Sequence, residues 1–252
     1  MPPDESLTIA TEEFDRGRGV FETVLVADGR PVRLAAHLER MRSSLRELFG
    51  ADLPATVADA AAEAARGVGL GRMRIDVSPG PAAELRENIA VTSIDPAIFF
   101  PDRAHGADLR TVHPPAWPGA HKLADRDWLE SVEAELGETV PLIVAGTDVL
   151  EAARANVCAV RDGELVTPPL DGRILPGTAR AATLVLAAEL GLPTAELPLR
   201  IADLGEAEDV FLTSSLRGIR PARSLDGAAL AQESELMPRL AAALRARWMD
   251  FG

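Results

Sequence analysis

One residue of this chain stands out for its chemistry, because lysine occurs only once, at Lys122, among 26 lysine and arginine residues. An arginine guanidinium stays protonated, whereas a lysine amine can lose its proton, attack a carbonyl group and form a Schiff base. A single lysine can also be an ordinary solvated charge, which is the common role of this residue type. The residues around Lys122 and downstream of it favour the chemical role.

Three further groups could act with such an amine. Leu175-Pro176-Gly177-Thr178 is a glycine turn that opens a helix, and backbone amides at a helix N-terminus can bind phosphate. Thr213-Ser214-Ser215 offers hydroxyl groups at the end of a strand, and Glu151 lies in an apolar stretch before a strand. Each group is common when it is taken alone, so only their combination indicates a site.

Other kinds of site are excluded or disfavoured. The four histidines show no metal-ligand spacing, and the single Cys158 excludes both an internal disulfide and a cysteine-based zinc site, so we expect no metal. His37 is interpreted as a structural histidine. Gly17-Arg18-Gly19 precedes a strand rather than a helix, which disfavours a dinucleotide-binding loop.

The composition is that of a globular chain. Its 252 residues, 47% of them hydrophobic, suffice for one large domain or two small ones. A net charge of −13 disfavours nucleic acid as a partner. No signal-peptide pattern begins the sequence, and no apolar stretch approaches the ~20 residues that a membrane span needs. We therefore expect a soluble, cytoplasmic protein without a membrane partner.

The segments that must position these groups are of mixed α and β type. Asp28-Gly29 between two apolar runs predicts a β-hairpin. The apolar spacing from Leu34 to Leu48 predicts an amphipathic helix that carries His37 and Arg40. Further elements are predicted as strands near 73–77, 88–94, 141–145, 156–160, 164–168, 195–197 and 210–213, and as helices near 54–66, 129–137, 178–190 and 233–248.

Prolines concentrate between Ile94 and Gly119, where the periodic patterns weaken. This segment predicts a boundary between two domains. We expect an N-terminal α/β domain over residues 1–112, an interdomain linker over 113–120, and a C-terminal domain over 121–252 that begins just before Lys122.

In this order, the groups resemble the fold-type IV pyridoxal-phosphate (PLP) dependent enzymes, the class-IV aminotransferase family. The resemblance extends from Phe14 to about Asp226. The matching stretches are Gly17–Thr23, His37–Arg40, His121–Arg126, Glu151–Val157, Val166–Leu170, Ile174–Arg180 and Phe211–Ser215. The resemblance implies PLP as the cofactor, and a mixed α/β (α+β) fold with a smaller N-terminal α/β domain and a larger, barrel-like C-terminal α/β domain.

The resemblance also assigns roles residue by residue. Lys122 matches the catalytic lysine that is joined to the cofactor, and Glu151 matches the glutamate that pairs with the pyridine nitrogen. Arg40 matches the arginine that holds the cofactor phosphate. A carboxylate at the pyridine nitrogen keeps it protonated, so that the ring withdraws electrons, and the phosphate needs donors and a cation.

The phosphate site is completed by residues of two turns. Gly177 and Thr178 match the phosphate-binding helix start, and Ser215 matches the hydroxyl near the phosphate. The family often has Gly-Ile-Thr where this chain has Gly177-Thr178-Ala179. A backbone contact survives that difference, whereas a threonine side-chain contact at position 179 does not.

Within the family, the chain is most similar to aminodeoxychorismate lyases. Aminotransferases often carry a tyrosine five residues after the lysine, but here this position is Asp127, and the chain has no tyrosine. Lyases tend to show Lys-x-x-x-Arg, which Lys122 and Arg126 match. The implied reaction converts 4-amino-4-deoxychorismate to 4-aminobenzoate and pyruvate. Because this substrate carries two carboxylates, Arg126, Arg110 and Arg217 are candidate substrate-binding residues.

Other functions stay open. A branched-chain or D-amino-acid aminotransferase would share every cofactor residue. A Schiff-base aldolase or lyase without a cofactor, and a non-catalytic binding protein with this fold, are further alternatives. The resemblance also implies a homodimer with its active site near the subunit interface, and functional coupling to aminodeoxychorismate synthase. It does not decide whether the product serves folate or a secondary metabolite.

Overall fold

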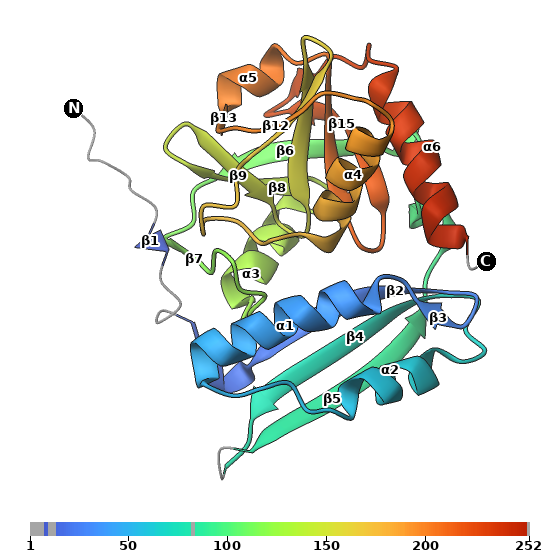
Figure 1. Cartoon of the computed structure of the whole chain (residues 1–252). Coiled ribbons are helices and arrows are strands. Elements are labelled where there is room, and N and C mark those ends of the chain that lie inside the picture. Colours follow the sequence, from blue (N-terminus) through green and yellow to red (C-terminus); the bar gives the residue numbers. More distant parts are fainter. Residues whose placement is uncertain (1–7, 10–13, 82–83, 251–252) are drawn as a thin grey trace.

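The computed structural model describes residues 8–9, 14–81 and 84–250 of the chain, which form two domains (Figure 1). The N-terminal domain is the lower one in Figure 1, coloured blue to teal, and the C-terminal domain above it runs from green to red. Helix α1 (Leu34–Phe49) lies on the side of the lower domain that faces the upper one. Residues at the start of this helix can therefore reach both domains.

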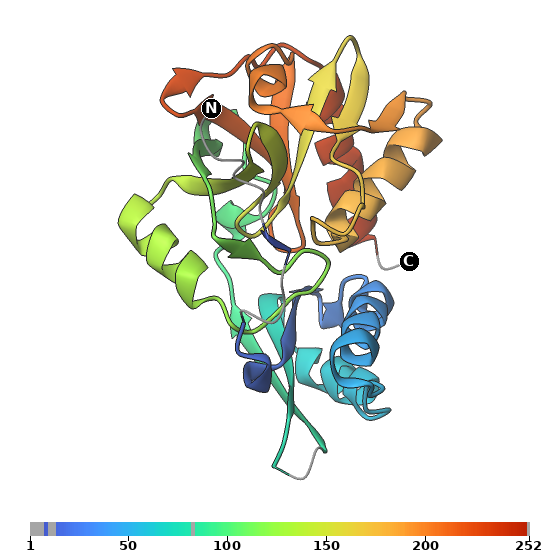
Figure 2. The same ribbon diagram turned by 90° about the vertical axis from the view of Figure 1, so that its left-hand side faces the viewer.

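The N-terminal domain is a four-stranded antiparallel sheet covered by two helices. The sheet order is β3-β2-β4-β5, and Figure 2 shows α1 and α2 on the same face. The elements are β2 (Val20–Ala27), β3 (Arg30–Pro31), β4 (Leu70–Pro79), β5 (Leu85–Ser93) and α2 (Val57–Ala65). The predicted hairpin is confirmed, with Asp28 (φ 45°) and Gly29 (φ 75°) in the left-handed conformation that a tight two-residue turn requires.

The C-terminal domain is built on a ten-stranded, curled sheet. Its order is β12-β11-β10-β14-β15-β6-β8-β9-β13, and β16 pairs with β15. A bridge between Ala152 and Ala155 brings β9 beside β10. The strands are β6 (Ala107–Val112), β8 (Val140–Ala145), β9 (Asp148–Ala152), β10 (Asn156–Arg161), β11 (Glu164–Thr167), β12 (Thr194–Glu196), β13 (Leu199–Arg200), β14 (Asp209–Ser214), β15 (Gly218–Leu225) and β16 (Ala228–Ala229). The expected mixed fold with a larger barrel-like domain is confirmed.

The helices of this domain lie around the sheet. They are α3 (Asp127–Leu136), α4 (Thr178–Glu189), α5 (Ile201–Gly205) and α6 (Leu236–Met249). Elsewhere in the chain, a short 3-10 turn precedes β2 at Arg16–Arg18, and two more lie between β5 and β6 at Pro96–Ile98 and Arg103–His105. A two-residue strand, β1 (Thr8–Ile9), pairs with β7 (Ala116–Trp117), which precedes Lys122. Among the described residues, none of the helices combines the length and the apolar character that crossing a membrane demands.

One strand belongs to a different sheet from the one its position suggests. The sequence assigns β6 to the N-terminal domain, but β6 pairs in parallel with β8 and β15 of the large sheet. A six-residue strand gives little periodic signal, and its partners lie far along the chain. We propose that the boundary between the domains falls between β5 and β6.

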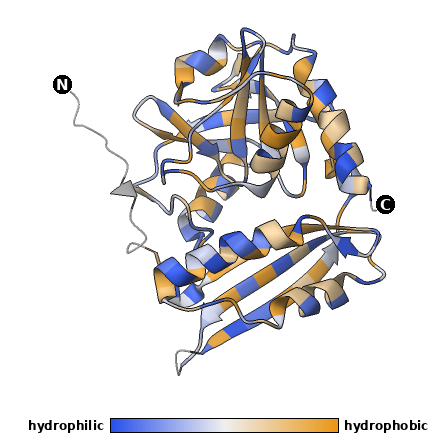
Figure 3. Cartoon of the chain, in the orientation of Figure 1, coloured by the Kyte–Doolittle hydropathy of each residue, from blue (hydrophilic) through white to orange (hydrophobic). Residues whose placement is uncertain are grey.

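The two domains share part of their apolar core. Figure 3 shows apolar residues alternating with polar ones along α1 and the strands of the lower sheet. Val24, Met41 and Met73 are buried inside the N-terminal domain. Leu25, however, belongs to a second cluster that contains Trp248 of α6 and other residues of the C-terminal domain. This shared core holds β2 against the domain that carries Lys122.

The start of β15 gives a prediction about stability. Gly218 has a φ of 62°, and a Cβ atom there would lie 2.2 Å from the Phe100 ring, which itself packs on Trp248. Gly218→Ala should lower the free energy of unfolding by about 3 kcal/mol, because a left-handed alanine costs about 1–2 kcal/mol and overpacking adds about 1–3 kcal/mol.

Gly163→Ala is the matched control, because Gly163 has a similar φ of 72° and nothing within 4 Å of its Cβ position. It should cost only the backbone part, about 1–2 kcal/mol. Urea unfolding of both variants measures the difference, and equal losses would contradict the packing of Phe100 on Gly218.

Candidate active site

Lys122 lies where the two domains meet. Its carbonyl accepts a hydrogen bond from the Phe21 N–H at 3.0 Å, and Ala124 N–H donates to Gly19 O at 2.9 Å. These contacts tie the Lys122 segment to the beginning of β2 in the other domain. The ammonium nitrogen lies 4.8 Å from the centre of the Phe21 ring. The position of Lys122 is thus fixed by backbone pairing across the domain boundary.

The surroundings of Lys122 favour its neutral form. Burial lowers the pKa of Lys122 from 10.5 to about 7, and the nearby charges of Arg40 and Arg126 add to the effect. Glu22 and Glu151 act in the opposite direction but do not compensate. A large fraction of this amine is therefore unprotonated at neutral pH, which suits a nucleophile or a general base.

Glu151 is buried on β9, beside β10. Its Oε1 atom accepts hydrogen bonds from Trp117 Nε1 at 2.8 Å and from the Leu175 N–H at 3.2 Å. Its Oε2 atom accepts only a long one, 3.3 Å, from Asn156 Nδ2. Burial raises the pKa of Glu151 to about 7, although the Trp117 and Leu175 donors oppose this shift. Oε2 keeps a lone pair for a further donor.

The turn before α4 requires glycine. A Cβ atom on Gly177 would lie 1.8 Å from Asn156 Oδ1, whose amide group also donates from Nδ2 to Leu175 O at 2.9 Å. Asn156 therefore packs directly on the turn, and only glycine leaves it room. The first backbone N–H groups of α4 have no partner inside the helix and are oriented for an anion. Ala179 is buried and offers only its backbone to this site.

Arg40 joins this turn to the N-terminal domain. Its Nε atom donates to Glu22 Oε1 at 2.7 Å, and Nη2 donates to Glu22 Oε2 at 2.6 Å. Nη1 donates to Pro176 O at 2.9 Å. Three of the five N–H groups of this guanidinium are thus used by the protein, and two remain for a ligand.

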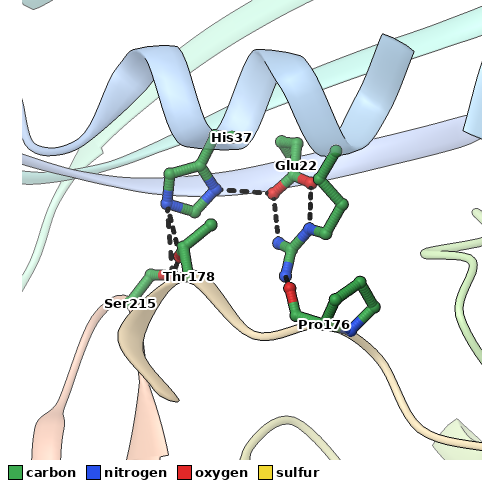
Figure 4. Close-up of polar contacts among 6 residues, drawn as sticks. Glu22, His37, Pro176, Thr178 and Ser215 are labelled. Atoms are coloured by element: carbon green, nitrogen blue, oxygen red, sulfur yellow. Dashed lines mark hydrogen bonds and ion pairs between the residues drawn. The ribbon is translucent and has the colours of Figure 1, made fainter. Parts of the chain in front are cut away.

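His37 makes a second connection between the domains (Figure 4). One ring nitrogen, Nδ1, lies 2.7 Å from Glu22 Oε2, and the other, Nε2, lies 3.1 Å from Thr178 Oγ1 and 3.3 Å from Ser215 Oγ. Burial alone would raise the pKa of Glu22, but Arg40 and His37 hold it at about 2. Burial lowers the pKa of His37, which favours the neutral form of its ring at neutral pH.

A cleft of about 940 Å³ opens from Lys122, and arginines line much of it. They are Arg40, Arg72, Arg74, Arg126, Arg154, Arg217, Arg220 and Arg223. Several are already engaged: Arg154 pairs with Glu133, for example, and Arg220 donates to backbone carbonyls. A cleft of this size and charge suits a small anionic ligand.

The three candidate substrate arginines have different positions. Arg126 lines the cleft beside Lys122, with Nη2 donating to Ala153 O at 2.7 Å, while its buried Nε has no partner among the described residues. Arg217 also lines the cleft, and its guanidinium contacts no acceptor in the part of the chain that the structure describes. Arg110 does not line it: Arg110 is exposed on β6, 3.8 Å from Asp226.

Comparison with known proteins agrees with this geometry. A family model described as amino-transferase class IV matches residues 19–225. The chain belongs to this family. A bifunctional aminodeoxychorismate lyase / D-amino acid transaminase from Mycobacterium tuberculosis is 30% identical over 247 residues, which cover 84% of this chain and 83% of the relative. Probable branched-chain-amino-acid aminotransferases of Synechocystis sp. and Thermotoga maritima are 33% and 31% identical, but the aligned stretches span only 38% and 45% of their lengths.

Solved structures also match nearly the whole chain. A hypothetical aminotransferase from Mycobacterium tuberculosis, in its PLP-bound form, has a TM-score of 0.81 at 25% identity and covers 98% of this chain and 94% of its own. A 4-amino-4-deoxychorismate lyase from Pseudomonas aeruginosa has a TM-score of 0.78 at 27% identity, with coverage of 93% and 92%.

The structure brings most of the predicted site residues together, and it adds residues that hold them which the sequence did not indicate. Arg40, Lys122, Arg126, Glu151, Gly177, Thr178, Ser215 and Arg217 lie together around the cleft floor and its walls. The sequence missed Glu22, His37, Trp117 and Asn156 as functional partners, because their contacts depend on the tertiary fold. Within the described residues, no group of three or more metal-ligating side chains occurs.

The low pKa of Lys122 gives a prediction about pH. In the cofactor-free protein, the rate at which Lys122 is acetylated should rise with pH through a midpoint at about 7 and level off at higher pH, because the neutral amine is the reactive form. Arg126→Met should move the midpoint upward, because the Arg126 charge helps to lower the pKa of Lys122. Acetic anhydride labelling with mass spectrometry of the Lys122 peptide measures this, and a midpoint near 10.5 in the wild type would contradict it.

Proposed function

We propose that this class IV protein is a PLP-dependent lyase that converts 4-amino-4-deoxychorismate to 4-aminobenzoate and pyruvate. The observation that carries the proposal is Arg126, whose guanidinium lies beside Lys122 with an unused Nε–H. Asp127, at the position of the aminotransferase tyrosine, is exposed and pairs with Arg18 at 2.5 Å. The site thus offers a cation, rather than a phenol, close to the reactive amine.

The residues present fit PLP as the cofactor. Two buried polar atoms, Arg126 Nε and Thr213 Oγ1, have no partner among the described residues, and Glu151 Oε2 has only one long contact. A polar ligand in the site would satisfy such groups. Arg40, the backbone at the start of α4 and the Ser215 hydroxyl would hold the phosphate, Glu151 the pyridine nitrogen, and Lys122 the aldehyde carbon. The PLP-bound relative supports this assignment.

Each residue then has a defined task. When bound, PLP supplies an electron-withdrawing ring for the bond that breaks at the amine-bearing carbon of the substrate. The Lys122 Nζ atom accepts the proton from that carbon, and a pKa near 7 suits a base at neutral pH. Arg126 and Arg217 donate to the two substrate carboxylates. Loss of the proton and of the three-carbon side chain as pyruvate leaves an aromatic ring.

An aminotransferase that acts on branched-chain or D-amino acids is the second candidate. The bifunctional relative is named for a transaminase activity as well as for the lyase activity, and further relatives are probable branched-chain-amino-acid aminotransferases. Such an enzyme would use the same residues for the cofactor, so those residues do not separate the two functions. The substrate does, because an amino-acid side chain without a second carboxylate leaves Arg217 without a partner.

The setting of the enzyme is also proposed. We infer a homodimer in the cytoplasm that receives its substrate from an aminodeoxychorismate synthase. The resemblance to class IV enzymes supports the dimer, and the chemistry of the substrate supports the coupling to a synthase.

Glu151 should matter for rate rather than for affinity. Glu151→Gln should bind PLP within about threefold of the wild type but lower kcat about 100-fold or more, because an amide does not hold the pyridine nitrogen protonated. PLP titration and single-turnover kinetics separate the two effects. A variant that reacts at the wild-type rate would show that Glu151 does not have this role.

Substrate turnover tests the proposed function itself. The enzyme should produce 4-aminobenzoate and pyruvate from 4-amino-4-deoxychorismate through many turnovers, without an added keto acid. Arg126→Gln and Arg217→Gln should each raise KM about tenfold or more, because each removes a charge-assisted hydrogen bond. Arg110→Gln, outside the cleft, is the control and should behave like the wild type.

The aminotransferase alternative predicts a different result in the same assays. Rapid amino transfer from a branched-chain or D-amino acid to a keto acid, with no 4-aminobenzoate formed, would establish the aminotransferase and refute the lyase.

A further inference from the structure

Two hydroxyl groups and one ring nitrogen form a triangle beside the proposed phosphate position (Figure 4). Thr178 Oγ1 lies 3.1 Å and Ser215 Oγ 3.3 Å from His37 Nε2, and the two hydroxyl oxygens are 3.2 Å apart. The three residues come from α1, from the first turn of α4 and from the turn after β14. All three pairs are within hydrogen-bond distance, so the positions of the protons decide which group remains free for a ligand.

The contact between His37 Nδ1 and Glu22, on the opposite side of the ring, determines where those protons lie. Glu22 is an ionised carboxylate that accepts two hydrogen bonds from Arg40, so it can only accept from His37 as well. His37 Nδ1 therefore carries the ring proton. In the neutral ring, which burial favours, Nε2 has no proton and acts as the acceptor for the hydroxyls that face it. Its single in-plane lone pair engages one of the two hydroxyls.

Thr178 is the better partner of that lone pair. Its hydroxyl is the closer of the two, and the residue is only 6% exposed, whereas Ser215 is half-buried and lines the large cleft. Thr178 also opens α4, so its backbone N–H points to the same site whatever its side chain does.

We propose that His37 is a positioning residue that engages the Thr178 hydroxyl, and thereby leaves the Ser215 hydroxyl as the member of the pair that donates to an anion in the cleft. The proposal rests on the proposed function, in which that anion is the phosphate of PLP. It divides the two hydroxyls: Ser215 binds the phosphate with its side chain, and Thr178 contributes its backbone N–H only.

The proposal predicts that the loss of PLP affinity caused by Ser215→Ala depends on whether His37 is present. Ser215→Ala should weaken PLP affinity by roughly tenfold or more, the loss of one hydrogen bond to a charged group, and Thr178→Val by less than about threefold. His37→Asn keeps a donor to Glu22 but has no atom at the Nε2 position, so it releases the Thr178 hydroxyl. In the His37→Asn protein, Ser215→Ala should then weaken PLP affinity by less than about threefold. Thr178→Val should weaken PLP affinity more in that protein than it does in the wild type.

The experiment is a double-mutant cycle on the full-length protein freed of cofactor and titrated with PLP. Pyridoxal, which lacks the phosphate, is the matched probe, and its affinity should not change in any variant. The ³¹P resonance of bound PLP should also shift in Ser215→Ala more than in Thr178→Val. If His37→Asn does not fold, the comparison of the two single variants still decides the outcome.

The possible outcomes distinguish the role of His37 from the proposed function on which it rests. Equal losses from Ser215→Ala and Thr178→Val, or a cost of Ser215→Ala that is the same with and without His37, would overturn the role of His37 while PLP binding stands. A wild-type protein that binds pyridoxal as tightly as PLP would instead refute the phosphate site, and with it the proposed function.

Discussion

The ion pair between Glu22 and Arg40 is the interaction on which the site depends. Glu22 is 1% exposed, and an ionised carboxylate is costly to bury unless its oxygens are satisfied. Arg40 and His37, one helical turn apart on α1, satisfy both oxygens and thereby fix α1 against β2. The same two side chains reach Pro176, Thr178 and Ser215, so the proposed phosphate site is assembled where both domains meet.

Two buried carboxylates lie near Lys122, and their pKa values are shifted in opposite directions. Glu22 faces a guanidinium and has a pKa of about 2, whereas Glu151 receives only neutral donors and burial raises its pKa to about 7. The first is a permanent charge that organises cations, and the second can share a proton with a ligand. Lys122, with a pKa of about 7, lies within the electrostatic influence of both. Opposite environments of this kind assign acid, base and structural roles within one site.

Local patterns predict the elements of this fold, and distant contacts decide the rest. Asp28-Gly29 and the apolar stripe of α1 determine the first hairpin and helix, and both appear as expected. The unusual rarity of lysine pointed to Lys122. Glu151 precedes strand β10 as the sequence predicts, but it also lies within β9, a five-residue strand that pairs antiparallel to β8 and that the sequence did not predict. Arg40 and Pro176 are 136 residues apart, so no local pattern reports their contact.

Reduction with borohydride in the presence of PLP tests the central claim most directly. Borohydride makes the bond between an amine and the cofactor irreversible, and a proteolytic digest then shows which peptide carries the added mass. Because the chain has a single lysine, the account predicts that all of the added cofactor mass lies on the peptide that contains Lys122. Recovery of that mass on the N-terminal amine alone, or on no peptide, would contradict the assignment of Lys122 and of the site built around it.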